Sequence, residues 1–429
     1  MRSKEAVDIS MTSAFGEYVN VLWDDYGLIF VDAGYKSRIN SMILAEERYR
    51  DCMNANFDER SPVPMLGKDL LKLKCTAAET MNVRFATDDK GLAIRHQAAD
   101  YMHYHCNEAY VLELYNALAD VNDYEFNATG LDTHVTSAMS ELRWTSGSYE
   151  VSRWTDWQYG AVISDKPVSP FTVLSLVMPI GTVSTKEITL DSCVSHRKLN
   201  KGNYTAGAEL NAVDKILFKE YLIEKNADYV HQREETALSY EAEYLICGHG
   251  SDAKNLAGIV HRILLLREVA NFERIYNDPG KMSIIRTITN VIAWVLMEPE
   301  IAEPLATMIA ACWAYIESIK DVKVLMAGGR VPFLKSDGEF YTDVYGSSAG
   351  HAEDKGLSYE DYLRAFIMLT DNEKLAVRFL DLLETSVINK DHNPNFRLDF
   401  CFDAWAVRAY ITSGYGYDYV AERNRDLWE

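Results

Sequence analysis

The chain has 429 residues, of which 48% are hydrophobic and 11% aromatic, and its 43 basic and 64 acidic side chains give a net charge of −21. The chain is longer than a usual domain with a single hydrophobic core, so we expect two packed regions. The composition excludes a largely disordered chain. Because the negative charge repels nucleic-acid phosphates and anionic lipid headgroups, we expect no nucleic-acid partner.

The cysteines are scattered, with no C-x-x-C pair and no short repeated spacing: Cys52, Cys75, Cys106, Cys193, Cys247, Cys312 and Cys401. Disulfide frameworks belong to small, cysteine-dense chains, so we expect none here. The odd count fits a reducing compartment or the surface of an anaerobe, and cysteine usage leaves both open.

The first predicted element is a helix that ends near Gly27, a residue suited to a left-handed C-terminal position. Its apolar stripe has spacings of four, three, four and three residues: Val7, Met11, Ala14, Tyr18 and Val21. The stripe begins without an N-cap, so we interpret it as the downstream part of a longer helix and expect its start to point outward. The most apolar run of the chain, 304–316, is shorter than the roughly 20 residues of a membrane span and predicts a core helix.

The remaining first half alternates short predicted strands with one helix near 94–106. The apolar or alternating segments predicted as strands are 28–31, 81–86, 171–179 and 183–190. A loop is expected around Ser61, Pro62 and Pro64, and a Trp-rich insertion of loops near 127–160. The basic stretch 195–204 is interpreted as a linker between the halves.

The second half is predicted to be mostly helical. The expected helices are 210–225, 256–270 with a cap at Ser251 or Asp252, 282–297, 304–319, 359–369 and 372–388. Segments 282–297 and 304–319 are apolar enough to be central. Segments 240–247 and 396–410 are predicted to be strands, and the tail after Ser413 is predicted to be irregular.

These elements predict an α+β fold with an N-terminal helix, a mixed α/β first half with a short sheet, and a mainly helical second half. The expected divisions are 1–35 (N-terminal helix, continuing a missing membrane helix, and first strand), 36–205 (mixed region), 206–412 (helix-rich region with a late strand) and 413–429 (tail).

The best metal-like cluster is formed by His103, His105 and Cys106. On a helix, residues two apart point about 200° apart, whereas zinc-binding helices use positions i and i+4. We therefore interpret the cluster as a solvated helix end with a half-buried cysteine.

The run from Cys247 to Asp252 contains a cysteine, a histidine and a serine, but sequence neighbours in a turn rarely meet as nucleophile and base. The glycines are expected to supply positive backbone angles, and Ser251 and Asp252 to cap the next helix. Residues 327–330 follow a helix and predict a turn, since phosphate loops precede a helix. The acidic pairs 24–25 and 88–89 are interpreted as solvated turns. We therefore assign no catalytic, cofactor-binding or metal-binding residue and expect no cofactor.

Several segments together resemble a known family. The segment MTSAFGEYVNVLWDDYGLIFVDAGY resembles the segment that follows the membrane helix in this family. The matching residues are Glu17, Tyr18, Tyr26, Gly27, Phe30 and Asp32. The segments FATDDKGLAIRHQAADYMHY, LSLVMP, SHRKLNKGN, YEAEYLICGHGSDAKNLAGIVHRILLLREVANF, VLMAGGRVPFLKSDGEF, GLSYEDYLRAF and FRLDFC follow in the same order. Together they resemble domain-of-unknown-function family 5702, the TadE/TadG-like proteins of tight-adherence pilus loci in Gram-positive anaerobes.

The resemblance implies a single-pass membrane protein whose large domain faces outside, with no catalytic residues assigned. Its expected partners are pilus or secretion-apparatus proteins, and the membrane through a segment absent from this chain. The resulting hypothesis is a non-catalytic, membrane-anchored component of a Flp-type pilus or another cell-surface assembly. The alternative is a soluble enzyme whose site is assembled from distant residues, which a deep pocket with His196, His249 or His261 beside carboxylates would indicate.

Overall fold

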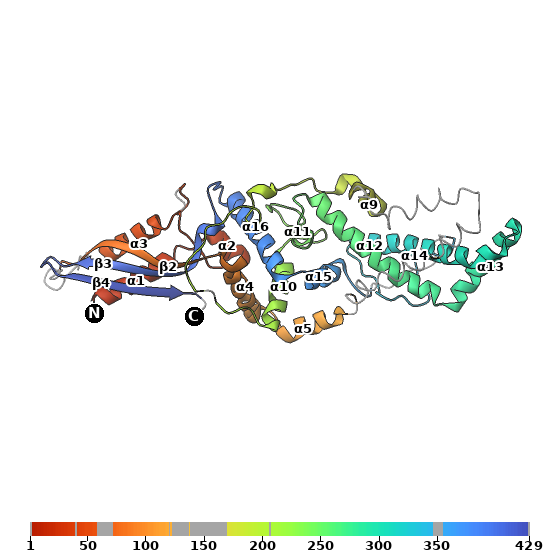
Figure 1. Ribbon diagram of the computed structural model, residues 1–429, viewed down its shortest axis with the longest axis horizontal. Helices are drawn as coiled ribbons and strands as arrows, with labels where there is room; N and C mark the ends of the chain where they lie inside the picture. Colours follow the sequence, from red (N-terminus) through yellow and green to blue (C-terminus); the bar gives the residue numbers. More distant parts are fainter. Residues whose placement is uncertain are drawn as a thin grey trace.

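The computed structural model describes residues 2–38, 41–57, 72–119, 121, 137, 170–205, 207–345 and 355–427. The molecule is long and narrow, with a β-sheet at one end, a helical body in the middle and a helical hairpin at the other end (Figure 1). Both labelled chain ends lie on the sheet side of the helical body.

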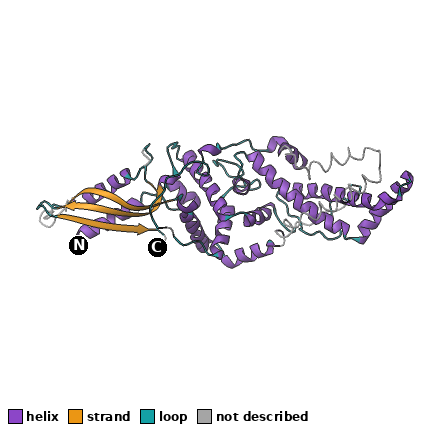
Figure 2. Cartoon of the chain, in the orientation of Figure 1, coloured by secondary structure: helices purple, strands orange, loops and turns teal. Residues whose placement is uncertain are grey.

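The sheet is antiparallel and is built around one strand from near the end of the chain. Strand β3 (Cys401–Thr412) pairs with β2 (Lys74–Phe85), with β1 (Val31–Asp32) and with β4 (Asp418–Asp426). Helices α1 (Arg2–Phe15) and α3 (Ile43–Phe57) pack against the sheet (Figure 2). Alternate residues of β3 enter this core, where Trp405 meets Tyr49 and Phe402.

The helical body has the largest core. Its helices are α2 (Asn20–Tyr26), α4 (Leu92–His105), α5 (Glu108–Ala117), α9 (Pro170–Val177), α10 (Ala212–Lys225), α11 (Glu241–Cys247), α15 (Tyr359–Leu369) and α16 (Asn372–Lys390). Tyr221 of α10 packs edge-to-face on Phe379 of α16, and its hydroxyl donates to the carbonyl of Tyr26. Segments far apart in sequence therefore close one core.

The hairpin end is formed by two long helices. Helix α12 (Asp252–Tyr276) extends from the helical body and packs along α14 (Ala302–Met326). Between them lie α13 (Pro279–Leu296) and a short 3-10 turn, η4 (Pro299–Ile301). Asp278 caps α13 by accepting N–H groups of Gly280 and Lys281, and Met297 ends it with a left-handed φ of 57°. Phe272, Ile285, Trp313 and Phe340 belong to a separate core in this region.

The α+β class with a mainly helical second half is confirmed. The predicted helices of the second half are present, often longer than expected, and Gly27 ends α2 with a φ of +68°. Strand β2 includes the predicted residues 81–85, and the late strand lies at β3. All seven cysteines are free.

Two segments predicted as strands are helices instead: 171–179 falls largely in α9 and 240–247 in α11. Short apolar runs do not distinguish a strand from a fully buried helix, and α11 has six buried residues in succession. Segment 183–190 is irregular apart from an isolated bridge between Glu187 and Ser251, and of 28–31 only Val31 lies in a strand.

The two ends of the chain also differ from expectation. The N-terminal helix is interrupted at residues 16–19, where Val19 donates its N–H to the carbonyl of Phe30. The tail after Ser413 is ordered as β4, because β3 offers it a full antiparallel partner from Ala404 to Thr412.

Some predictions stay untested. Ser61, Pro62 and Pro64, most of the Trp-rich insertion and Met1 lie outside the described residues, and the domain divisions stay predictions. Over the parts of the chain that the structure describes, no helix is long and apolar enough to cross a membrane.

Candidate functional site

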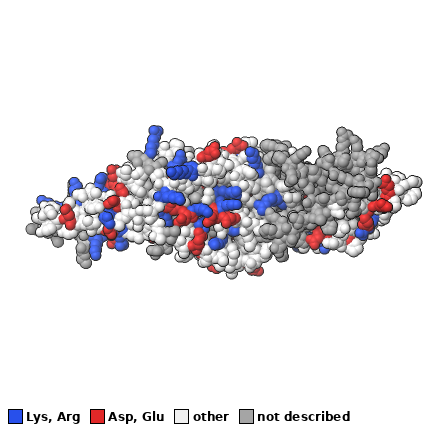
Figure 3. Space-filling view, in the orientation of Figure 1, with Lys and Arg blue, Asp and Glu red and all other residues white. Residues whose placement is uncertain are grey.

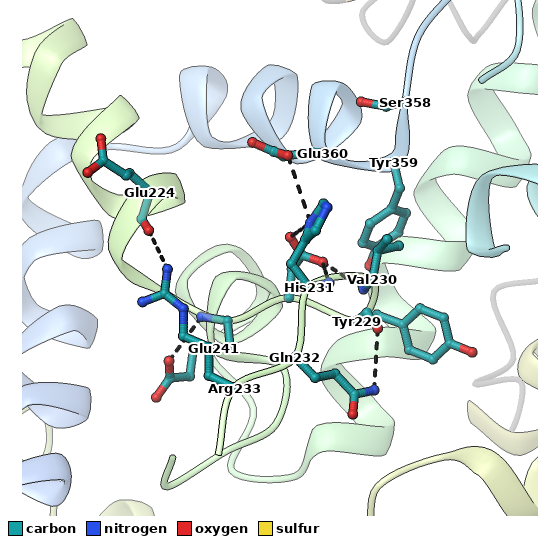
Figure 4. A network of polar contacts seen from close by, with 12 residues as sticks. Glu224, Tyr229, Val230, His231, Gln232, Arg233, Glu241, Ser358, Tyr359 and Glu360 are labelled. Atoms are coloured by element: carbon teal, nitrogen blue, oxygen red, sulfur yellow. Dashed lines mark hydrogen bonds and ion pairs between the residues drawn. The ribbon is translucent and has the colours of Figure 1, made fainter. Parts of the chain in front are cut away.

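A polar network surrounds the turn between α10 and α11 (Figure 4). The Asp228 carboxylate accepts the N–H groups of Val230 and His231 at 2.6 and 2.7 Å, and its second oxygen lies 3.0 Å from Nδ1 of His231. The His231 ring also lies 3.8 Å from Glu360 of α15. The hydrogen bond with Asp228 raises the pKa of His231, so this side chain favours the charged form.

Two buried carboxyl groups of α11 accept hydrogen bonds from backbone N–H groups of the same turn. Glu243 accepts the N–H of Tyr229 at 2.9 Å and the hydroxyl of Tyr359 at 2.7 Å, and Glu241 accepts the N–H of Ala227 at 3.1 Å. Burial raises the pKa of Glu241 to about 7 and that of Glu243 to about 8, with the charge of Asp228 adding to the second shift.

Carboxyl groups with near-neutral pKa values are suited to general acid–base catalysis. Here, however, each carboxyl accepts a backbone N–H group of the turn, the second oxygen of Glu243 is buried without a hydrogen-bond partner, and neither carboxyl lines the hollows described below. The arrangement fixes the turn to α11 and α15.

A second polar cluster joins α12 and α14 to residues 331–342. Asp321 binds both Arg267 and Lys335, and Lys335 also contacts Glu317, with no exposed surface on any of these four side chains. Glu317 additionally accepts the N–H groups of Tyr341 and Thr342. The cluster ties an irregular segment to the two long helices and leaves no ion open to a ligand.

The predicted histidine cluster diverges as expected. His103 pairs with Asp214 at 3.0 Å, His105 stacks on Tyr101 with ring centroids 3.9 Å apart, and Cys106 is half-buried. Across the described residues, no three His, Cys, Asp or Glu side chains are placed to hold a metal ion.

The run from Cys247 to Asp252 is a helix-to-helix connection. Gly248 ends α11 with a φ of +76°, whereas Gly250 is required by close approach, since an added Cβ would lie 2.6 Å from the Ile188 carbonyl. Burial raises the pKa of Cys247 to about 11, which lowers its thiolate fraction at neutral pH.

Ser251 occupies the N-cap position of α12, but its side chain makes no capping hydrogen bond, contrary to expectation. Asp252 instead accepts from the Ser184 hydroxyl at 2.6 Å and from the N–H of Ser239 at 2.9 Å. Its carboxylate therefore joins three segments of the chain.

The other predicted turns are found only in part, because Asp24 and Asp25 lie within the helix α2 and Asp88 and Asp89 lie in a 3-10 turn, η1 (Asp88–Lys90). Residues 327–330 turn after α14, with Gly328 at a φ of +84°. Asp25 pairs with Lys390 at 2.8 Å on the surface. Asp88 is not a simple solvated residue, since its carboxylate accepts the N–H groups of Phe85 and Gly202 and thereby joins the end of β2 to the predicted linker.

The hollows on the described surface include the following three. Two of them, of about 230 and 420 Å³, share the Glu17–Arg48 ion pair and Tyr35 near α1 and α3. The third, of about 580 Å³, lies at the end of α13 and includes Trp294 and Met297. None of these hollows is lined by His196, His249 or His261.

Among the described residues, the end of α13 has the largest run of exposed apolar side chains. Trp294 is 79% exposed and Met297 89% exposed, and several neighbours are also open to solvent: Ile284, Val291, Ile292, Val295 and Leu296. The prediction that 282–297 is central is therefore wrong for most of this helix, of which one side packs on α14 and the rest faces out.

The family model of a family of unknown function, DUF5702, matches residues 167–413, more than half of the chain. The chain belongs to DUF5702. No curated protein and no solved structure matches it. The DUF5702 match contains the turn of Figure 4, the buried Arg267–Lys335 cluster and all of α13, whereas α1 to α5 precede it.

Sequence reasoning missed the polar clusters and the exposed helix end. The clusters join residues up to about 130 positions apart, so spacing gives no signal for them. The sequence does contain a signal for the exposed helix end. Residues 287–297 contain no charged side chain, and their apolar residues surround the helix instead of forming one stripe.

Proposed function

We propose that this DUF5702 protein is a non-catalytic, membrane-anchored, extracytoplasmic component of a tight-adherence (Flp-type) pilus or another cell-surface assembly. The observation that carries the proposal is the exposed apolar end of α13, at the opposite end of the long molecule from the N-terminus (Figure 1). Exposed apolar patches larger than a few hundred Å² are typical of interaction sites.

The polar chemistry of the molecule supports a structural role. The buried ions between α12 and α14 bind one another and backbone groups, and the carboxyls beneath the turn of Figure 4 bind backbone N–H groups. On the face drawn in Figure 3, Lys and Arg lie among Asp and Glu across the middle of the molecule, without a large basic surface for nucleic acid.

The anchoring and the pilus association rest on the resemblance of residues 11–35 and of the segments that follow in order. An anchor on the N-terminal side would hold the sheet end near the membrane and place α13 away from it. In this arrangement the apolar helix end faces other surface proteins.

The test is made on the native gene in its own cells, by fractionation followed by protease treatment of intact cells and detection with an antibody. A membrane-bound, protease-sensitive protein that crosslinks to pilus proteins is the expected result. A soluble protein protected inside the cells would overturn the proposal.

A soluble enzyme is the second candidate, favoured by the near-neutral pKa values of Glu241 and Glu243. A metabolite screen that finds turnover, lost in Glu243→Gln protein that remains folded, would establish it.

A further inference from the structure

Helix α13 has two apolar faces. Met282, Ile285 and Ala293 face the core, while Ile284, Ile288, Val291 and Val295 form an outer stripe with spacings of four, three and four residues. Ile284, Val291 and Val295 are exposed and Ile288 is half-exposed. This spacing is that of a helix seam that packs against another helix.

The outer stripe is self-complementary when two copies of α13 run antiparallel. With a two-fold axis midway between Ile288 and Val291, Ile284 of one copy meets Val295 of the other, and Ile288 meets Val291. The two basic side chains of α13 already have partners within the chain, since Lys281 pairs with Asp278 and Asp337 and Arg286 pairs with Glu303.

We propose that two copies of this chain associate through the outer stripe of α13, as an antiparallel helix pair. This partner deepens the proposed structural role and rests on it. Ile284, Val291 and Val295 are 52%, 59% and 66% exposed and would contribute to such an interface, which in stable protein complexes buries roughly 800 Å² per partner.

Charge allows a second copy in spite of the net −21. Charges farther than about 8 Å from the seam are screened at physiological ionic strength. Between Arg286 and Glu298 the helix has no charged side chain, and Arg286 and Glu303 pair at 2.8 Å. A lipid surface fits less well, because Glu298 and Glu300 directly follow the apolar end and repel anionic headgroups.

The first test is the mass of the purified full chain, measured by sedimentation across a concentration series. The expected result is a dimer that Val291→Lys weakens more than about tenfold, because two like charges then meet near the axis. Val420→Lys on β4 is the matched control, since Val291 and Val420 are both 59% exposed. A chain that stays monomeric, or a dimer equally sensitive to both variants or to neither, would overturn the proposal.

The register has its own test. Ile284→Lys and Val295→Glu should each weaken the dimer, and mixing the two variants should restore it, because the new lysine and glutamate then face each other. Failure of the mixture to associate, with both variants folded by circular dichroism, would rule out the antiparallel pair.

Vesicle binding tests the lipid alternative, and cellular location tests the proposed function, so each can fail separately from the dimer. Monomeric protein that binds phosphatidylcholine vesicles, and loses this binding in Trp294→Ser, would replace the dimer by a membrane contact. A dimer confirmed in solution, together with a protein found inside the cell, would keep this inference and overturn only the surface location.

Discussion

Arg267 of α12 and Asp321 of α14 form an ion pair from which solvent is excluded, with Nε 2.9 Å from Oδ2 and no exposed surface on either side chain. Arg267 also donates to the carbonyls of Pro332 and Phe333, and Lys335 binds the second oxygen of Asp321. The pair thus fixes the distance between the two long helices and the path of the segment that follows them. A buried pair costs desolvation energy, so its value lies in holding a specific arrangement.

Lys335→Met should lower the free energy of unfolding by about 3–5 kcal/mol, because it leaves Glu317 and Asp321 buried without their shared cation. Urea denaturation followed by circular dichroism measures the change. The matched control is Lys90→Met, which removes a solvent-exposed pair with Glu373 and should cost at most about 1 kcal/mol. Equal losses in the two variants would contradict the structural role of the buried cluster.

Glu268→Met should stabilise the protein at pH 8 by about 1–3 kcal/mol, because Glu268 is buried and its Oε2 has no hydrogen-bond partner. Burial raises the pKa of Glu268 from 4.5 to about 8. Since the folded pKa is the higher one, the stability that the wild-type protein has below pH 4.5 is lost as the pH rises through 8. The advantage of the variant should therefore shrink toward pH 5, which unfolding at a series of pH values would show. A pH-independent difference would contradict a raised pKa.

Gly248→Ala should destabilise the protein by about 2–3 kcal/mol, since a side chain is strained at positive φ and the lost contacts add to this cost. An added Cβ would lie 2.5 Å from the Arg378 guanidinium, which donates to the carbonyls of Leu245 and Ile246 at 2.7 Å. Gly181→Ala is the control, because nothing lies within 4 Å of its added Cβ. Thermal unfolding compares the two, and a loss at Gly181 as large as at Gly248 would refute the explanation.

Asp252→Ala should cost about 2–3 kcal/mol, because it leaves the donors of Ser184, Ser239 and Tyr240 without their acceptor. Ser251→Ala should change stability by less than about 0.5 kcal/mol, since its side chain makes no capping bond. Chemical denaturation of both variants measures the difference. A larger loss at Ser251 than at Asp252 would restore the capping role that the sequence suggested.

Periodicity was reliable where a helix was long and one-sided. The stripe through Leu256, Ile259, Ile263 and Leu266 predicted α12, and all four residues are buried. It was unreliable for Tyr244 and its neighbours, because a short helix buried on every side has the same apolar pattern as a central strand. For the candidate sites, sequence reasoning correctly separated His103 from His105, since that argument needs only helix geometry.

The sequence by itself determined the long helices of the second half, the class of fold, the left-handed turns at Gly27 and Gly248 and the family. Each follows from local backbone preferences or from the order of residues along the chain. Tertiary structure alone decided that Lys335 meets Glu317 and Asp321, that Glu243 supports the turn at Tyr229, and that the end of α13 is left uncovered. Burial and pairing depend on which distant segments fill the space around a side chain, and an apolar residue has the same identity on a core face and on an open one.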